Sequence, residues 1–213
     1  MRVIQAESAG FCYGVERAVT LAEETAREKG GCVMLGSIIH NANVVAELER
    51  EGMRLIASPE EAKAGETVLV RSHGESRKTL ETLAARGAEI VNATCPNVRH
   101  IQSLVTEAEQ AGRQVVIIGE QEHPEVRGIA SWCEGARVFG NAEEVAKWMG
   151  KKGNIANLPI TMVAQTTCIR SIWEECVKFL KKQCTNAEIF DTICDATQKR
   201  QSEAANIAGR ADV

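Results

Sequence analysis

The chain has 213 residues, with 25 Lys or Arg against 29 Asp or Glu, and therefore a formal net charge of −4 at pH 7. Hydrophobic residues make up 44% and charged residues 25%, which excludes a disordered chain and is typical of a globular protein. The mildly acidic charge argues against general nucleic-acid binding. No apolar run approaches the roughly 18 residues of a membrane helix, and the N-terminus turns polar too early for a signal peptide. We therefore expect a cytoplasmic protein with no membrane or nucleic-acid partner.

Strand-like and helix-like segments alternate along the chain. Short runs rich in β-branched residues predict buried parallel strands at 68–70, 115–118 and 161–164, and a further strand is expected at 3–6. Amphipathic stretches predict helices at 15–29, 98–112, 171–183 and 198–210. Such alternation without hairpin turns is typical of βαβ units, so the predicted fold class is α/β with parallel sheets.

Two parts of the chain repeat the same landmarks at the same spacing. In each part a cysteine precedes a helix, a glycine lies 24 residues later and a histidine lies 28 residues later. The landmarks are Cys12, Gly36 and His40 in the first part, and Cys95, Gly119 and His123 in the second. The approach to the cysteine also repeats, since 88–95 and 187–194 share Ala, Glu, Ile and Cys in register. This self-similarity predicts repeated α/β units.

The repeat divides the chain at three cysteines. We expect a first α/β unit at 13–96, a second at 97–194, and a partial third unit, a strand plus a helix, made of 1–12 and 195–213. The glycine of a third unit would fall at position 218, 24 residues after Cys194 and beyond Val213. The predicted architecture is a pseudo-threefold trefoil of small parallel-sheet units around a central metal site, with its third unit incomplete.

The cysteines fall into two groups. Cys12, Cys95 and Cys194 occupy equivalent strand-to-helix junctions, at the sheet edge where α/β folds bind ligands, and the adjacent helix N-termini are expected to lower their pKa. Three converging thiolates would hold an iron–sulfur cluster with one iron lacking a protein ligand, or a zinc ion completed by His or water. The other five do not lie at equivalent positions of the repeat. They are expected to be ordinary buried or surface thiols: Cys32, Cys133, Cys168, Cys176 and Cys184.

Polar residues are predicted at the same edge of the sheets. His40, His73 and His123 each follow a strand-like run, where imidazolium groups would bind phosphate oxygens through charge-assisted hydrogen bonds. Glu125 would have a raised pKa beside a bound phosphate and a reduced cluster, which suits a proton donor. Thr166 offers a hydroxyl to a substrate or its water. The alternatives are structural histidines, a surface carboxylate and a strand-end cap.

Taken in order, these motifs resemble the 4-hydroxy-3-methylbut-2-enyl diphosphate reductase family of the non-mevalonate isoprenoid pathway. The resemblance covers essentially the whole chain and rests on 10–18, 39–41, 72–74, 93–96, 119–128, 165–167 and 192–194. It implies reductive dehydroxylation of an allylic diphosphate, (E)-4-hydroxy-3-methylbut-2-enyl diphosphate, to isopentenyl and dimethylallyl diphosphate. Ferredoxin or flavodoxin would supply the electrons.

The same resemblance implies a role for each candidate residue. Cys12, Cys95 and Cys194 would bind a [4Fe–4S] cluster at the centre of the trefoil. The diphosphate would face the three histidines: His40, His73 and His123. Glu125 would supply protons and Thr166 would help to position the substrate hydroxyl.

Two departures from the family pattern set limits on these expectations. Asn92 stands where the family usually has Asp, and the Ser-x-Asn motif and later Ser of the third unit, which also bind diphosphate, have no counterpart here. The chain alone is therefore expected to have little or no activity. A catalytically silent cluster-binding protein, acting in electron transfer or redox sensing, and a zinc-bound structural protein remain the alternatives.

Overall fold

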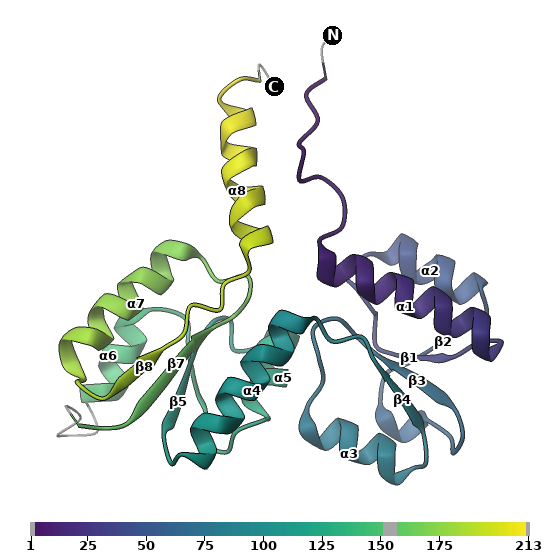
Figure 1. Ribbon diagram of the computed structural model, residues 1–213, viewed down its shortest axis with the longest axis horizontal. Helices are drawn as coiled ribbons and strands as arrows, with labels where there is room; N and C mark the ends of the chain where they lie inside the picture. The colour runs from purple at the N-terminus through teal and green to yellow at the C-terminus, as the bar shows by residue number, and fades with distance from the viewer. Residues whose placement is uncertain (1–2, 151–156, 212–213) are drawn as a thin grey trace.

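Two lobes, each built around a parallel sheet, make up most of the computed structural model, which describes residues 3–150 and 157–211 (Figure 1). The first lobe contains the four strands β1 (Val33–Leu35), β2 (Arg54–Ile56), β3 (Thr67–Val70) and β4 (Glu89–Asn92) in the order β2-β1-β3-β4. Its helices are α1 (Tyr13–Lys29), α2 (Ala42–Arg50), the short 3-10 helix η1 (Pro59–Glu61) and α3 (Arg77–Ala85).

The second lobe repeats the strand order of the first. Its strands are β5 (Gln114–Ile118), β6 (Arg137–Phe139), β7 (Ile160–Ala164) and β8 (Ala187–Ile189), in the order β6-β5-β7-β8. Its helices are α4 (Pro96–Gln110), α5 (Pro124–Ala130), α6 (Ala142–Gly150) and α7 (Arg170–Gln183). All strand pairs in both sheets are parallel, which confirms the predicted α/β class.

Each sheet is covered by helices on both faces, which explains the continuous apolar runs of its central strands. In the first lobe, Met34 and Leu69 pack with α1 and α2, whereas Val68 and Val70 pack with α3 on the opposite face. In the second lobe, one face of the sheet packs against α4 and α5 and the other against α6 and α7. The lobes meet where the indole Nε1 of Trp132 donates to the carbonyl of Glu75 at 3.2 Å.

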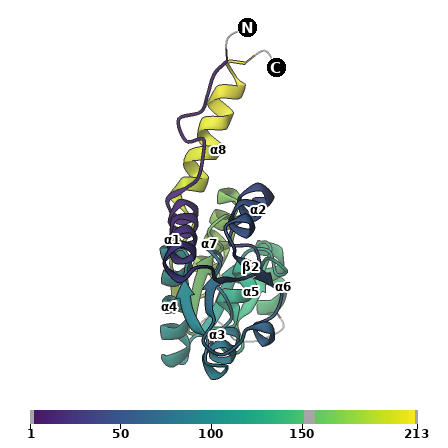
Figure 2. The ribbon, with the colours of Figure 1, turned by 90° about the vertical axis from the view of Figure 1, so that its right-hand side faces the viewer.

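The last helix, α8 (Asp195–Ala208), projects away from both lobes with the N-terminal segment at its side, as Figures 1 and 2 show from two directions. The strand expected at 3–6 is absent, since these residues have no regular secondary structure. A strand requires a neighbouring strand to complete its backbone hydrogen bonds, and this segment lies beside a helix instead. Its assignment with α8 to a third unit stays a prediction.

The four helices expected from the sequence are present, although α8 begins three residues earlier than the expected start at 198. The strands expected at 68–70, 115–118 and 161–164 correspond to β3, β5 and β7, with each observed strand one residue longer at its start. Across the described ranges of the chain, no helix is both long and apolar enough to span a bilayer.

Candidate active site

The three repeat cysteines each stand immediately before a helix. Cys12, Cys95 and Cys194 are the N-cap residues of α1, α4 and α8, and their side chains are half-buried. All three line one cavity of about 280 Å³. The same cavity is lined by every other residue that the sequence singled out for a site: His40, His73, His123, Glu125 and Thr166. Residues from both lobes and from α8 therefore converge on one place.

Two of the cysteines are held by the same backbone hydrogen bond. The amide of Cys95 donates to the carbonyl of Ser72 at 2.9 Å, and the amide of Cys194 donates to the carbonyl of Thr166 at 2.8 Å. Ser72 and Thr166 lie at equivalent positions, two residues after β3 and β7. Each bond therefore fixes a candidate metal ligand to the loop that carries candidate substrate-binding residues.

The Cys95 thiol is not activated by its helix N-terminus as the sequence suggested. Burial raises the pKa of Cys95, and this outweighs the opposing hydrogen bonds from the backbone of Asn97 and Val98; nearby Cys194 and Cys12 raise it further. The side-chain amide of Asn97 donates to Sγ of Cys194 at 3.4 Å. Because three clustered thiolates repel one another, a bound cationic centre would be needed to hold them ionised.

Three thiols on one cavity are a donor set for a metal centre. Within residues 3–150 and 157–211, however, no set of three or more His, Cys, Asp or Glu side chains is arranged to hold a metal ion. Three thiolates could hold an iron–sulfur cluster with one iron lacking a protein ligand, or a zinc ion completed by His or water.

The three histidines form a compact triangle. Ring centroids are 4.4 Å apart for His40 and His73, 5.9 Å for His73 and His123, and 6.4 Å for His40 and His123. Burial lowers the pKa of His73 to about 4, helped by His40, His123 and Arg71. His73 is therefore neutral at pH 7 in the free protein, and not the imidazolium that the sequence suggested. Its Nδ1 is buried without a hydrogen-bond partner among the described residues, as expected of a group that awaits a ligand.

Glu125 and Thr166 are joined by two hydrogen bonds. The Thr166 amide donates to Glu125 Oε1 and the Thr166 hydroxyl contacts Glu125 Oε2, each at 2.7 Å. The amide of Glu125 in turn donates to His123 Nδ1 at 3.1 Å, so the neutral His123 ring carries its proton on Nε2. Glu125 is only 3% exposed, and burial raises the pKa of its carboxyl against the lowering effect of the Thr166 bonds. The rise thus needs no ligand, whereas the sequence had attributed it to bound phosphate.

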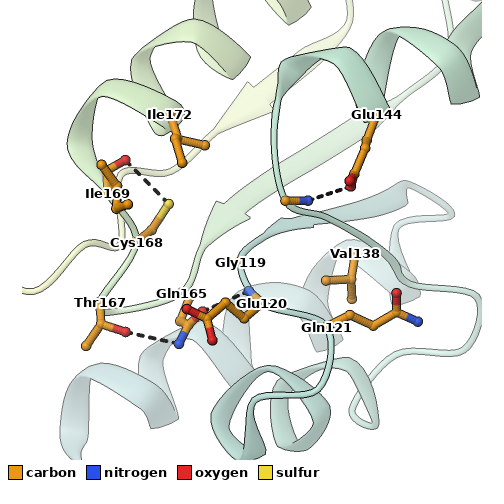
Figure 3. Close-up of a pocket in the computed structure, with 11 residues that line it drawn as sticks. Gly119, Glu120, Gln121, Val138, Glu144, Gln165, Thr167, Cys168, Ile169 and Ile172 are labelled. Atoms are coloured by element: carbon orange, nitrogen blue, oxygen red, sulfur yellow. Dashed lines mark hydrogen bonds between the residues drawn. The ribbon is translucent and has the colours of Figure 1, made fainter.

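A second cavity, of about 240 Å³, lies beside the first and shares Thr167 with it (Figure 3). Gln165 links its walls, because its Oε1 accepts from the amide of Glu120 and its Nε2 donates to the Thr167 hydroxyl, each at 3.0 Å. Gly119 allows this approach, since a Cβ there would lie 2.8 Å from Gln165 Cβ. Gln165 therefore ties the loop that leads to His123 to the strand end that carries Thr166.

The other five cysteines are all buried, which is one of the two placements expected for them. Burial raises the pKa of Cys32, Cys133 and Cys176 to about 11, so these thiols are unreactive near neutral pH. Cys168 and Cys176 both belong to the core beneath α7.

Gly14 is a site residue that the sequence reasoning missed. A Cβ at this position in α1 would lie 2.6 Å from Sγ of Cys95 and 3.3 Å from its Cβ. The absence of a side chain lets α1 and α4 place Cys12 and Cys95 side by side on the cavity. A glycine near the start of a helix is too common a feature to have indicated this contact.

Comparison with known proteins gives a consistent result. A family model described as LytB protein matches residues 3–213. The 4-hydroxy-3-methylbut-2-enyl diphosphate reductase of Caldanaerobacter subterraneus subsp. tengcongensis is 40% identical over 221 residues, covering 100% of this chain and 74% of the relative. The protein of the same name from Geobacter sulfurreducens is 39% identical over 213 residues, covering 100% of this chain and 73% of the relative.

Two solved structures are also similar. One is described as (E)-4-hydroxy-3-methyl-but-2-enyl diphosphate reductase, the terminal enzyme of the non-mevalonate pathway. It has a TM-score of 0.80 at 36% identity, covering 99% of this chain and 74% of that chain. The other, E-1-hydroxy-2-methyl-but-2-enyl-4-diphosphate reductase from Plasmodium falciparum, has a TM-score of 0.86 at 26% identity, covering 95% of this chain and 64% of that chain.

The close approach of Gly14 to Cys95 predicts that a Gly→Ala substitution destabilises the protein, which is the opposite of its usual effect inside a helix. Gly→Ala inside a helix normally stabilises by up to about 1 kcal/mol, but Gly14→Ala should destabilise the protein because the new methyl group overlaps Sγ of Cys95. Gly150→Ala, where a Cβ meets nothing within 4 Å, is the matched control and should be neutral or stabilising. Urea unfolding of both variants measures the difference, and a Gly14→Ala variant as stable as Gly150→Ala would contradict the prediction.

Proposed function

Because the chain belongs to the LytB family, whose members are 4-hydroxy-3-methylbut-2-enyl diphosphate reductases and hence oxidoreductases, we propose that it acts on the same substrate. The reaction is the reductive dehydroxylation of (E)-4-hydroxy-3-methylbut-2-enyl diphosphate, in which two electrons and two protons are consumed and water leaves. Isopentenyl and dimethylallyl diphosphate are the products, formed in the cytoplasm. The convergence of three N-cap cysteines, three histidines and the Glu125–Thr166 pair on one cavity carries the proposal.

We assign Cys12, Cys95 and Cys194 as the ligands of a [4Fe–4S] cluster, since the three thiols line one cavity and the resemblance to the reductase family implies this ligand set. When bound, the cluster would supply single electrons and a Lewis-acidic iron without a protein ligand. Ferredoxin or flavodoxin is the proposed electron donor, as the resemblance to the reductase family implies.

The histidine triangle is the proposed binding site of the diphosphate. His123 can donate from Nε2, because its Nδ1 already accepts the amide of Glu125. The buried His73 is neutral in the free protein, so a diphosphate beside it would favour protonation of its ring. Binding of the dianionic group and uptake of a proton are thereby coupled, and the charge-assisted bonds form only when the ligand is present.

Glu125 is the proposed proton donor and Thr166 its link to the substrate hydroxyl. The raised pKa of the Glu125 carboxyl allows it to keep a proton closer to neutral pH than an exposed glutamate would. The proton can pass from Glu125 Oε2 to Thr166 Oγ1, 2.7 Å away, as the threonine hydroxyl gives its own proton to the departing oxygen. Burial of both side chains excludes water that would otherwise compete for this proton.

The assignment of the cysteines predicts a sharp division among them. Cys12→Ser, Cys95→Ser and Cys194→Ser should each abolish the cluster, whereas Cys168→Ser and Cys176→Ser, in the core under α7, should retain it. Iron and sulfide analysis after anaerobic reconstitution, with absorbance near 400 nm, distinguishes an iron–sulfur cluster from zinc. Full cluster content in Cys95→Ser would refute the assignment.

The role of Glu125 predicts a separation of binding from turnover. In a chain continued to the length of its relatives, Glu125→Gln should still bind substrate, because the amide can maintain both contacts with Thr166, but turnover should fall by about 10²–10⁴. Glu122→Gln, at an exposed carboxylate three residues away, is the matched control. Turnover with reduced methyl viologen and substrate titration measure the two effects. Normal turnover in Glu125→Gln would remove it as proton donor.

A polypeptide of these 213 residues alone is expected to bind the cluster yet show little or no reductase activity. Two relatives are longer than this chain, which covers 74% and 73% of them. Two missing charge-assisted bonds to diphosphate, at about 1.5–3 kcal/mol each, would weaken binding by roughly 10²–10⁴. A cluster-bearing but inactive polypeptide corresponds to the electron-transfer or sensing alternative. Equal kcat/KM for the 213-residue and an extended polypeptide would contradict this expectation.

A further inference from the structure

The N-terminal segment and α8 run side by side away from the two lobes (Figures 1 and 2). α8 has no buried residue, and residues 3–6 before the first turn have no regular structure. Within the part of the chain that the structure describes, neither element packs into a hydrophobic core. Polar contacts join the two elements instead.

Two side chains of α8, one turn apart, make those contacts. Glu203 accepts from the amides of Glu7, at 2.5 Å, and Ser8, at 2.8 Å, and also from the Ser8 hydroxyl. Arg200 donates from Nε to the carbonyl of Ser8 at 3.2 Å and from Nη2 to that of Gly10 at 2.5 Å. The Glu203 carboxylate thus accepts hydrogen bonds from backbone amides, and the Arg200 guanidinium donates to the backbone carbonyls that follow. We refer to these five hydrogen bonds as the clasp.

The clasp joins the chain segments that carry two of the three candidate ligands. Ser8 and Gly10 precede Cys12 by four and two residues, and Arg200 follows Cys194 by six residues on the helix that Cys194 caps. Arg200 also lines the cavity that contains both cysteines. Gly10 has a φ of +101°, a conformation that favours glycine, so the turn that presents its carbonyl to Arg200 suits this residue.

We propose that Arg200 and Glu203 are positioning residues that hold the loop before Cys12 against α8, so that Cys12 and Cys194 face the same cavity. This inference rests on the proposed function, because it assigns the clasp a purpose in assembling the cluster site. Without the clasp, Cys12 would stay attached to α1 but its preceding loop would move freely. The cluster would then lose a rigid ligand on one side and bind with lower occupancy.

Hydrogen exchange followed by mass spectrometry tests the clasp in the apo protein. In Arg200→Gln combined with Glu203→Gln, exchange within residues 3–11 should be roughly tenfold faster, since charge-assisted bonds at Glu7 and Ser8 are lost. Gln201→Ala, at the exposed residue between them, is the control and should exchange as the wild type does. Unchanged exchange in the double variant would overturn the proposal.

Iron and sulfide content after anaerobic reconstitution tests the consequence. The double variant should retain less than half of the wild-type cluster, whereas Gln201→Ala should retain all of it. Faster exchange together with full cluster content would also overturn the proposal, because the clasp would then be structural only. Cys12→Ser separates the two hypotheses: if it binds as much iron as the wild type, the proposed function fails, whatever the double variant does.

Discussion

The hydrogen bond from a cysteine amide to the carbonyl two residues beyond a central strand is the interaction on which the site depends. It occurs at Cys95 with Ser72 and at Cys194 with Thr166. In a parallel sheet the carboxyl ends of neighbouring strands lie at the same edge, so one such bond places a helix start capped by a candidate metal ligand beside a loop with candidate substrate-binding residues. Because both lobes use the same strand order, both deliver their groups to one cavity.

Burial shifts the pKa of three groups of the free site toward their uncharged forms. It raises the pKa of Cys95 and Glu125 and lowers that of His73. Each shift reflects the free-energy cost of burying a charge in the empty cavity. A cationic centre near the cysteines would favour their thiolate forms, and an anion near the histidines would favour imidazolium. The two ligands would therefore bind to regions that accept charges of opposite sign.

Much of this arrangement could be predicted from sequence because it is periodic. The repeat phase separated Cys12, Cys95 and Cys194 from five buried thiols, and long apolar runs predicted the central strands. Three features depended on tertiary contacts and could not be predicted. The segment at 3–6 has strand-like residues but no partner strand, burial outweighs the helix N-terminus at Cys95, and the contact between Gly14 and Cys95 joins two helices far apart in the chain.

The candidate metal ligands and the candidate substrate-binding residues follow strands that occupy different positions in the sheets. Cys95 and Cys194 follow β4 and β8, each paired on one side only, whereas His73 and Thr166 follow β3 and β7, which are paired on both sides and fully buried. Strands at a sheet border open more readily than strands in its middle. If Cys95 and Cys194 hold the proposed cluster, the small movements of sulfur that accompany electron transfer would be absorbed at these more flexible edges of the sheets. His73 and Thr166, which are proposed to bind the substrate, would keep their places because their strands lie in the middle of the sheets.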